Sequence, residues 1–126
     1  MKVSSLAIIQ VARQTFSRPK DIFAMELKYP AWDERKFRSC FGTAPQKIKH
    51  LYKACERYCE ENNRTNPATN IKNLLFYMHY VWNYPSWHAF SFLVGKSVGY
   101  LMDHCVAVRD LLSDMSHDIV STMCRL

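Results

Sequence analysis

The chain has few of the residue patterns that mark enzymes and metalloproteins. Its histidines have no serine, cysteine or carboxylate partner at a spacing that specifies a catalytic site. Cys55, Cys59 and His50 come nearest to a zinc ligand set, but the second pair of ligands that zinc requires is missing. We interpret these cysteines as buried thiols and expect no metal, no cofactor and no catalysis. Four C-terminal aspartates are interpreted as the polar side of one helix and not as a metal-binding array: Asp103, Asp110, Asp114 and Asp118.

Long hydrophobic runs are also absent. The most apolar N-terminal stretch, residues 4–12, contains Gln10 and is followed by Arg13, so it is too short to span a bilayer and makes a poor signal peptide. We interpret it as a helix that ends before Pro19. Its predicted buried stripe consists of Val3, Ala7, Ile8, Val11, Ala12 and Phe16. Because only two basic residues flank the stretch, an amphipathic membrane anchor is less favoured, and we expect no membrane partner.

The cysteine count and the composition limit the class of protein. Five cysteines are an odd number and are widely scattered, which favours reduced thiols and an intracellular location over a disulfide framework. With 126 residues, 48% of them hydrophobic, the chain can bury one sizeable core, so we expect a single helical domain over residues 1–126. Seventeen Lys and Arg against eleven Asp and Glu give a net charge of +6, which favours an anionic partner.

Hydrophobic residues recur at helical spacing along most of the chain, and this predicts an all-α, compact bundle of about five or six helices. The predicted parts are an N-terminal helix and connector in 1–30, a basic helical half in 31–62, a loop in 63–70, and an aromatic helix with a helix-turn-helix-like unit in 71–126. The polar loop chemistry extends over residues 62–70. The aromatic helix that begins at Ile71 is expected to be central.

The basic half opens with a short polar helix after residues 30–33 that ends at Phe41 and Gly42. We expect the next helix to start at Thr43, with a capping box between Thr43 and Gln46 and with Pro45 in the first turn. Its predicted buried face consists of Ile48, Leu51, Tyr52, Cys55, Tyr58 and Cys59. On another face Lys49, Lys53 and Arg57 recur every four residues, a stripe that could follow phosphates or could be an ordinary solvated helix face.

Residues 86–112 have the spacing of two helices joined by a tight turn. Ser86 is placed to cap the first helix, Gly95 to end it in left-handed backbone, and Ser97 to cap the second. The second helix has a predicted buried face of Val98, Leu101, Cys105, Val108 and Leu112, and it occupies the position of a recognition helix in a DNA reader. Periodicity alone favours an architectural turn over DNA binding, since many all-α domains join helices through glycine.

Three segments carry a resemblance to a known family: Phe37–Thr43 (FRSCFGT), Asn73–Tyr84 and Leu93–Ser97 (LVGKS). They resemble the N-terminal helical region of Harbinger-type DDE transposases, and the similarity covers roughly residues 35 to 114. In that family the region is similar to a helix-turn-helix module that precedes a separate nuclease domain with three metal-binding carboxylates. Because this chain stops before such a domain, the resemblance implies a noncatalytic fragment, a truncated relic or a recruited module that binds double-stranded DNA. It also implies a nuclear location, and that Lys96, Ser97 and Tyr100 approach the groove.

The chain departs from that family where the recognition helix begins. Relatives tend to have basic residues just after the capping serine, whereas this chain has Val98 and Gly99, and Asp103 opposes phosphate. Residues 1–72 carry fourteen basic and seven acidic side chains, a balance of +7 that leaves −1 for the remainder. We therefore predict that the phosphate contacts come from the first half: Arg35, Lys36, Arg38, Lys49, Lys53 and Arg57.

Protein interaction is the alternative function that the sequence leaves open. In this interpretation the helix-turn-helix is architectural, and an exposed aromatic surface near Trp82, Tyr84 and Trp87 docks a partner helix or a second copy of the chain. One continuous positive face would favour DNA, and scattered charge beside an apolar patch would favour a protein partner.

Overall fold

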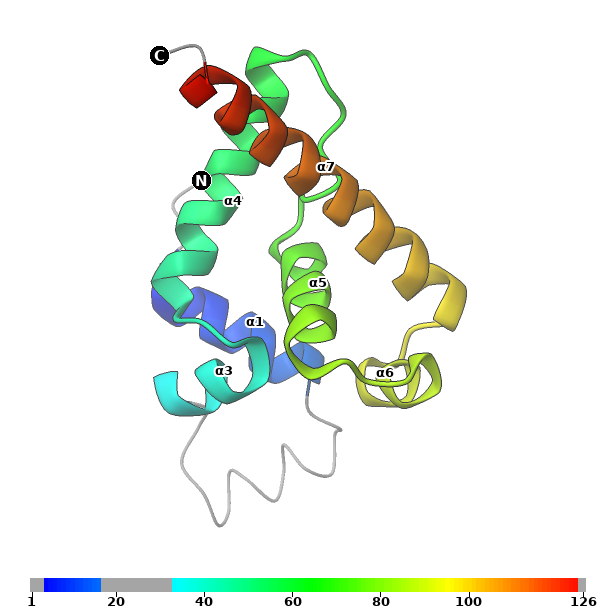
Figure 1. The fold of residues 1–126 in the computed structure, drawn as a ribbon. Coiled ribbons are helices and arrows are strands. Elements are labelled where there is room, and N and C mark those ends of the chain that lie inside the picture. Colours follow the sequence, from blue (N-terminus) through cyan, green and yellow to red (C-terminus); the bar gives the residue numbers. More distant parts are fainter. Residues whose placement is uncertain (1–3, 17–32, 125–126) are drawn as a thin grey trace.

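The computed structural model of the chain describes residues 4–16 and 33–124, with side chains described as far as His117. This part of the chain folds into six α-helices and contains no strand (Figure 1). The helices are α1 (Ser5–Phe16), α3 (Glu34–Phe41), α4 (Pro45–Glu61), α5 (Ile71–Asn83), α6 (Trp87–Val94) and α7 (Val98–Cys124). The all-α bundle predicted from the sequence is confirmed. None of these helices is long and apolar enough to cross a membrane.

Helix α5 lies in the middle of the bundle, as its aromatic sequence predicts (Figure 1). Its buried residues are Leu74, Leu75, Phe76 and His79, which point to several sides of the helix. Leu75 and Phe76 belong to a core shared with α1, α3 and α6, whereas Leu74 belongs to a second core with α4 and α7. Helix α1 covers the first core with Ile8, Ala12 and Phe16, part of its predicted stripe. Ala7 and Val11 are half-buried, and Val3 lies outside the described residues.

Local capping determines where α6 ends and α7 begins. The Ser86 Oγ accepts a hydrogen bond from the Ala89 N–H at 3.1 Å, and Gly95 ends α6 with φ of +71°. After a three-residue turn, the Ser97 Oγ accepts from the Tyr100 N–H at 3.1 Å. The predicted helix-turn-helix-like unit and its three cap residues are therefore confirmed. Helix α7 is long, and its buried face runs through Leu101, Cys105, Val108 and Leu111; the predicted Val98 and Leu112 are half-buried.

The start of α4 differs from the prediction. Ala44 is the N-cap, with extended backbone and no side-chain cap, so the expected Thr43–Gln46 capping box is wrong. The reason is Pro45, which occupies the first helical position and disfavours helical backbone at the residue before it. Residue 44 thus becomes the last non-helical residue, and Thr43 lies one residue too early to cap. The predicted buried face is confirmed for Ile48, Cys55 and Cys59; its three other members are half-buried.

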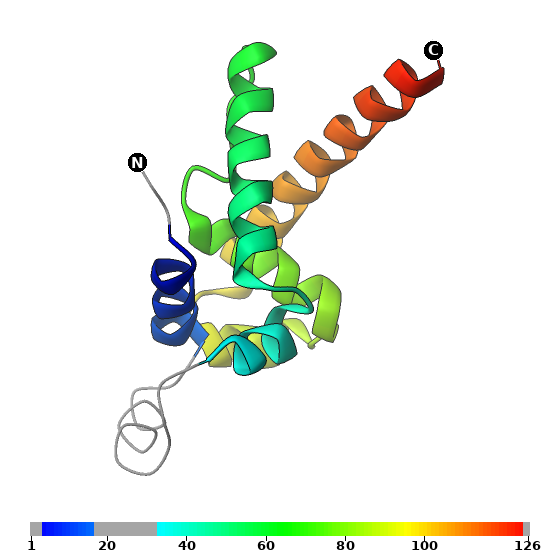
Figure 2. The same cartoon turned by 90° about the vertical axis from the view of Figure 1, so that its left-hand side faces the viewer.

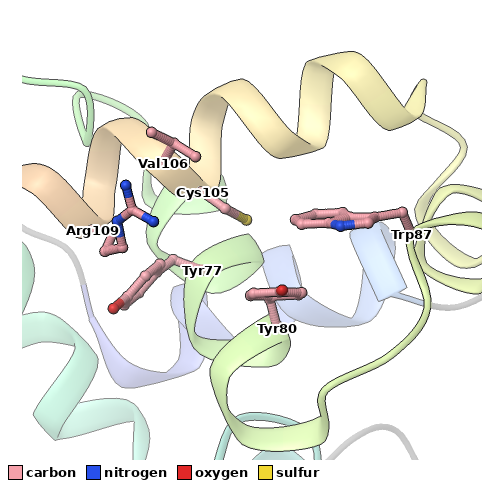
Figure 3. Close-up of a pocket in the computed structure, with 6 residues that line it drawn as sticks. All are labelled: Tyr77, Tyr80, Trp87, Cys105, Val106 and Arg109. Carbon is pink, nitrogen blue, oxygen red and sulfur yellow. The ribbon is translucent and has the colours of Figure 1, made fainter.

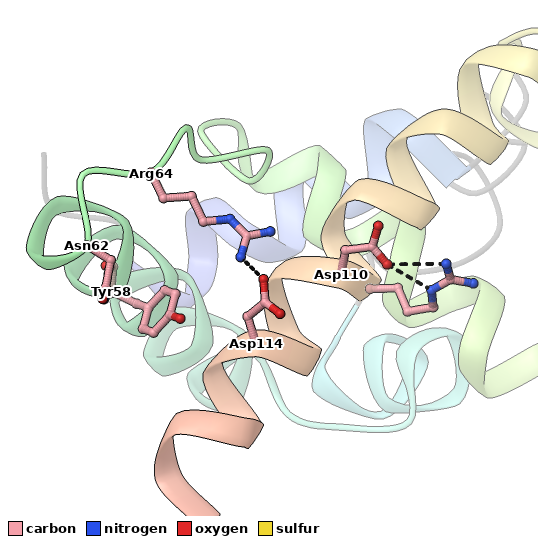
Figure 4. Close-up of polar contacts among 6 residues, drawn as sticks. Tyr58, Asn62, Arg64, Asp110 and Asp114 are labelled. Carbon is pink, nitrogen blue, oxygen red and sulfur yellow. Dashed lines mark hydrogen bonds and ion pairs between the residues drawn. The ribbon is translucent and has the colours of Figure 1, made fainter. Parts of the chain in front are cut away.

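The segment between α4 and α5 is a loop, as predicted, but it is folded back onto the bundle. Ala68 is fully buried in the second core, and the Asn70 Oδ1 caps α5 by accepting from the Lys72 N–H at 3.0 Å. Arg64 pairs with Asp114 of α7 (Figure 4). The Asn62 Nδ2 donates to the Tyr58 carbonyl at 2.9 Å. These contacts tie the loop to α4 and α7.

Candidate nucleic-acid interface

Helix α3 exposes its cations because its aromatic residues face the core. Phe37 and Phe41 are fully buried, and their rings lie 4.6 Å apart. The Asp33 Oδ1 caps the helix by accepting from the Lys36 N–H at 2.9 Å. The predicted phosphate contacts on this helix, Arg35, Lys36 and Arg38, are all exposed. Arg38 also approaches Glu34 at 3.5 Å, an exposed pair that contributes little to stability.

Helix α4 continues this positive charge along its first half. Lys53 and Arg57 are exposed and Lys49 is half-buried, on the side of the helix away from Ile48 and Cys55. Lys47 is also exposed, but it falls outside the four-residue spacing from which the stripe was predicted. The charge is uneven along the helix, since no carboxylate precedes Glu56 on α4. Arg57 stands beside acidic residues and is therefore the weakest of the predicted contacts on this helix.

Residues 34–53 carry six cations against the single carboxylate of Glu34, a net charge of +5. We call these six side chains the basic surface: Arg35, Lys36, Arg38, Lys47, Lys49 and Lys53. Helices α3 and α4 are joined by a short turn and contact each other. Figure 2, which faces the left-hand side of Figure 1, shows both helices in front. The basic surface therefore consists of cations carried by two helices that contact each other.

The residues predicted from the recognition helix lie elsewhere. The turn before α7 is at the right-hand edge of Figure 1, and α4 is on the left. Ser97 uses its hydroxyl to cap α7, and the Lys96 Nζ lies 5.4 Å from the centre of the Tyr100 ring. That ring also stacks on His104, with centroids 4.0 Å apart. The structure thus brings Lys96, Ser97 and Tyr100 together with one another, but not with the basic surface.

Cys40 and His79 form a contact that the sequence did not reveal. The sulfur of Cys40 lies 3.4 Å from His79 Nδ1, although the two residues are 39 positions apart. No sequence spacing indicated this partner of His79, because the packing of α3 on α5 brings the two residues together. The same nitrogen lies 3.1 Å from the Cys40 carbonyl oxygen, which also accepts from Asn83 Nδ2 at 2.7 Å. The cluster fastens the end of α3 to α5.

Burial keeps this pair uncharged. It raises the pKa of the Cys40 thiol to about 12, an effect that the Lys36 charge only partly opposes. Burial also lowers the pKa of His79, against the smaller effect of its hydrogen bond to the Cys40 backbone. A neutral thiol beside a neutral imidazole is not an activated nucleophile at neutral pH. The arrangement therefore suits a structural contact better than a catalytic one.

We expect the protein to lose stability as the pH falls through 6.5 toward the lowered pKa of His79 in the folded chain. Below pH 6.5, the ordinary pKa of histidine, His79 is mostly protonated in the unfolded chain. In the folded chain its pKa is lowered, so it takes up the proton only at a more acidic pH. Acid therefore favours unfolding across that window. Thermal unfolding followed by circular dichroism should show a smaller fall in His79→Gln than in the parent. An equal fall in both proteins would contradict the assignment to His79.

Cys55 and Cys59 do not share a side of α4 with His50. Cys55 and Cys59 are buried, whereas His50 is exposed on another side of α4. Burial raises the pKa of Cys55 to about 11, so its thiol stays protonated at neutral pH. Within residues 4–16 and 33–117, no group of three or more His, Cys, Asp and Glu side chains could hold a metal ion. Asp103, Asp110 and Asp114 lie exposed along α7; the side chain of Asp118 lies outside the described residues.

The predicted aromatic surface is divided between two sides of α5. The Trp87 ring stacks on Tyr80 at 4.4 Å, and Tyr80 lies 6.1 Å from Tyr84. Trp82 instead packs against Gly42, in the turn between α3 and α4. Trp87 and Tyr84 are therefore joined through Tyr80, while Trp82 belongs to a different side.

A hollow of about 90 Å³ lies between α5, α6 and α7 (Figure 3). Its lining is mostly apolar and consists of Tyr77, Tyr80, Trp87, Cys105, Val106 and Arg109. An engineered cavity of about 150 Å³ can hold benzene, so this hollow has room for little more than one small apolar side chain. It is too small for an ordinary cofactor.

Comparisons of the chain with protein-family models, with curated proteins and with solved structures found no match. The resemblance to Harbinger-type transposases thus stays a prediction from the sequence.

Proposed function

We propose that the chain is a noncatalytic module that binds double-stranded DNA through the phosphate backbone. The observation that carries this proposal is the net charge of +5 over residues 34–53, displayed on the adjacent helices α3 and α4. Cations on neighbouring helices can contact successive phosphates, and the release of condensed counterions then drives binding. Lys49 is half-buried, and the other five cations of the basic surface are exposed. A nuclear location is part of this proposal.

Little sequence preference is expected from such a surface. Phosphate contacts position a protein on DNA but do not read bases. The start of α7 offers few base-reading groups, because Gly99 has no side chain, Val98 is half-buried and Asp103 is exposed. Ser97 is already engaged as a cap. The proposal therefore places the main contacts on α3 and α4 and not on α7.

The test is a titration of labelled duplex DNA at several salt concentrations. The affinity should fall by roughly a hundredfold or more between 50 and 200 mM salt if about five phosphates are neutralised. Duplexes of unrelated sequence should bind with similar affinity, measured by fluorescence anisotropy. Absence of binding at low salt would sink this proposal.

Protein interaction is a second candidate, favoured by the uncharged region on α5 and α6. Residues 73–95 contain no Asp, Glu, Lys or Arg, and they leave Tyr84 and Phe92 exposed by 77% and 68%. Charge depletion and aromatic enrichment are typical of interface centres. Of the possible partners, a second copy can be tested directly. A sedimentation coefficient that rises with protein concentration in the absence of DNA would support this function.

A further inference from the structure

Trp82 is an exposed indole that is supported on one face. Its side chain is 58% exposed, although it is among the largest apolar side chains. The ring lies against Gly42 so closely that an added Cβ would be 2.4 Å from it. Gly42 has φ of +74°, so both its conformation and the neighbouring ring disfavour any larger residue. The turn therefore holds the indole in place and leaves more than half of it in contact with solvent.

The Trp82 indole lies next to the turn that joins α3 and α4, the two helices that carry the basic surface. Gly42 ends α3, and its N–H donates to the Arg38 carbonyl at 2.8 Å. Lys47 follows the same turn in the first turns of α4. Gly42 and Trp82 each belong to a chain segment without Asp or Glu, residues 35–55 and 73–95. Neither segment therefore adds negative charge where the two residues meet. The indole thus lies against the turn that joins the two helices carrying the basic surface.

We propose that Trp82 stacks on an unpaired base and gives the basic surface a preference for single-stranded DNA. The inference rests on the proposed DNA binding, to which it adds a binding residue and a strand preference. Proteins that bind single strands combine cations that follow the backbone with aromatic side chains that stack on bases. Duplex DNA keeps its bases stacked inside the helix, so it can use the cations but not the indole. Stacking is independent of base identity because every base has an aromatic face.

The experiment compares an oligothymidylate of about 20 nucleotides, longer than a typical single-strand binding site, with a duplex of equal length at one salt concentration. Trp82→Ala should weaken binding of the single strand by about tenfold to a hundredfold, the range for loss of one stacked base. Binding of the duplex should change little. Fluorescence anisotropy measures both affinities.

Tyr84→Ala is the matched control. Tyr84 is an even more exposed aromatic residue two positions away, but its ring lies beside Tyr80, whereas the ring nearest to Gly42 is that of Trp82. This variant should bind both forms of DNA as the parent does. Trp82→Phe, which keeps a stacking ring and much of the packing on Gly42, should recover most of the single-strand affinity. It also keeps the test valid if Trp82→Ala fails to fold.

Intrinsic fluorescence supplies a second measurement. Oligothymidylate should quench the parent protein, and Trp82→Phe should lose most of that response although Trp32 and Trp87 remain. Full quenching in Trp82→Phe, or equal weakening of both DNA forms in Trp82→Ala, would overturn the role of Trp82 while leaving DNA binding intact. If the parent binds neither form at low salt, the proposed function fails as well.

Discussion

Replacing Lys49, Lys53 and Arg57 by glutamine should lower the affinity for duplex DNA on the order of a hundredfold at 0.1 M salt. Each lost phosphate contact should reduce the slope of log affinity against log salt by about 0.9, so the triple variant should lose up to about three units. Lys53 and Arg57 are exposed and Lys49 is half-buried, so the substitutions should not damage the core. Anisotropy titrations at four or five salt concentrations give the slope.

Lys96→Gln is the control for the triple variant, because Lys96 lies at the turn before α7 and not on α4. It should reduce the affinity by less than the triple variant does. If Lys96→Gln loses binding and the triple variant does not, the recognition helix is the contact surface and the assignment to α4 is wrong. If neither substitution changes DNA binding, the stripe is a solvated helix face, and protein interaction becomes the preferred function.

The substitution Phe90→Ala should destabilise the fold by about 3–5 kcal/mol, the range for removing a fully buried aromatic ring. Phe90 is the only fully buried residue of α6. Its ring centroid lies 5.2 Å from that of His79, 6.1 Å from Phe76 and 6.3 Å from Phe16, so it joins α6 to α1 and α5. The thermal midpoint should fall by roughly 10–20 °C.

Phe92→Ala is the matched control on the same helix. Phe92 is 68% exposed, so the same change of chemistry should alter the free energy of unfolding by no more than about 0.5 kcal/mol. Thermal or urea unfolding of both variants provides the comparison. A Phe90→Ala protein as stable as Phe92→Ala would mean that α6 is not anchored through this ring.

The sequence predicted those features that depend on residues close together in the chain. Ser86, Gly95 and Ser97 are caps in the structure because capping uses hydrogen bonds over three or four residues. The buried stripe of α7 follows from helical periodicity, which also predicted its helix. Thr43 failed as a cap for an equally local reason, since Pro45 moved the helix start by one residue. The sequence shows both patterns, the capping box and the proline, and in the structure the proline determines where the helix begins.

The sequence by itself predicted an all-α bundle of about five or six helices, part of each buried face that it assigned, and a concentration of positive charge in the first half of the chain. Only the tertiary structure decided which exposed faces lie together, because that depends on how distant helices pack. It placed α4 and the turn before α7 at different sides, separated Trp82 from Trp87, and brought Cys40 to His79 across 39 residues. It also brought the Trp82 indole onto Gly42 beside the basic surface. Helical spacing specifies the direction of a side chain from its own helix, but not which side chains of other helices it meets.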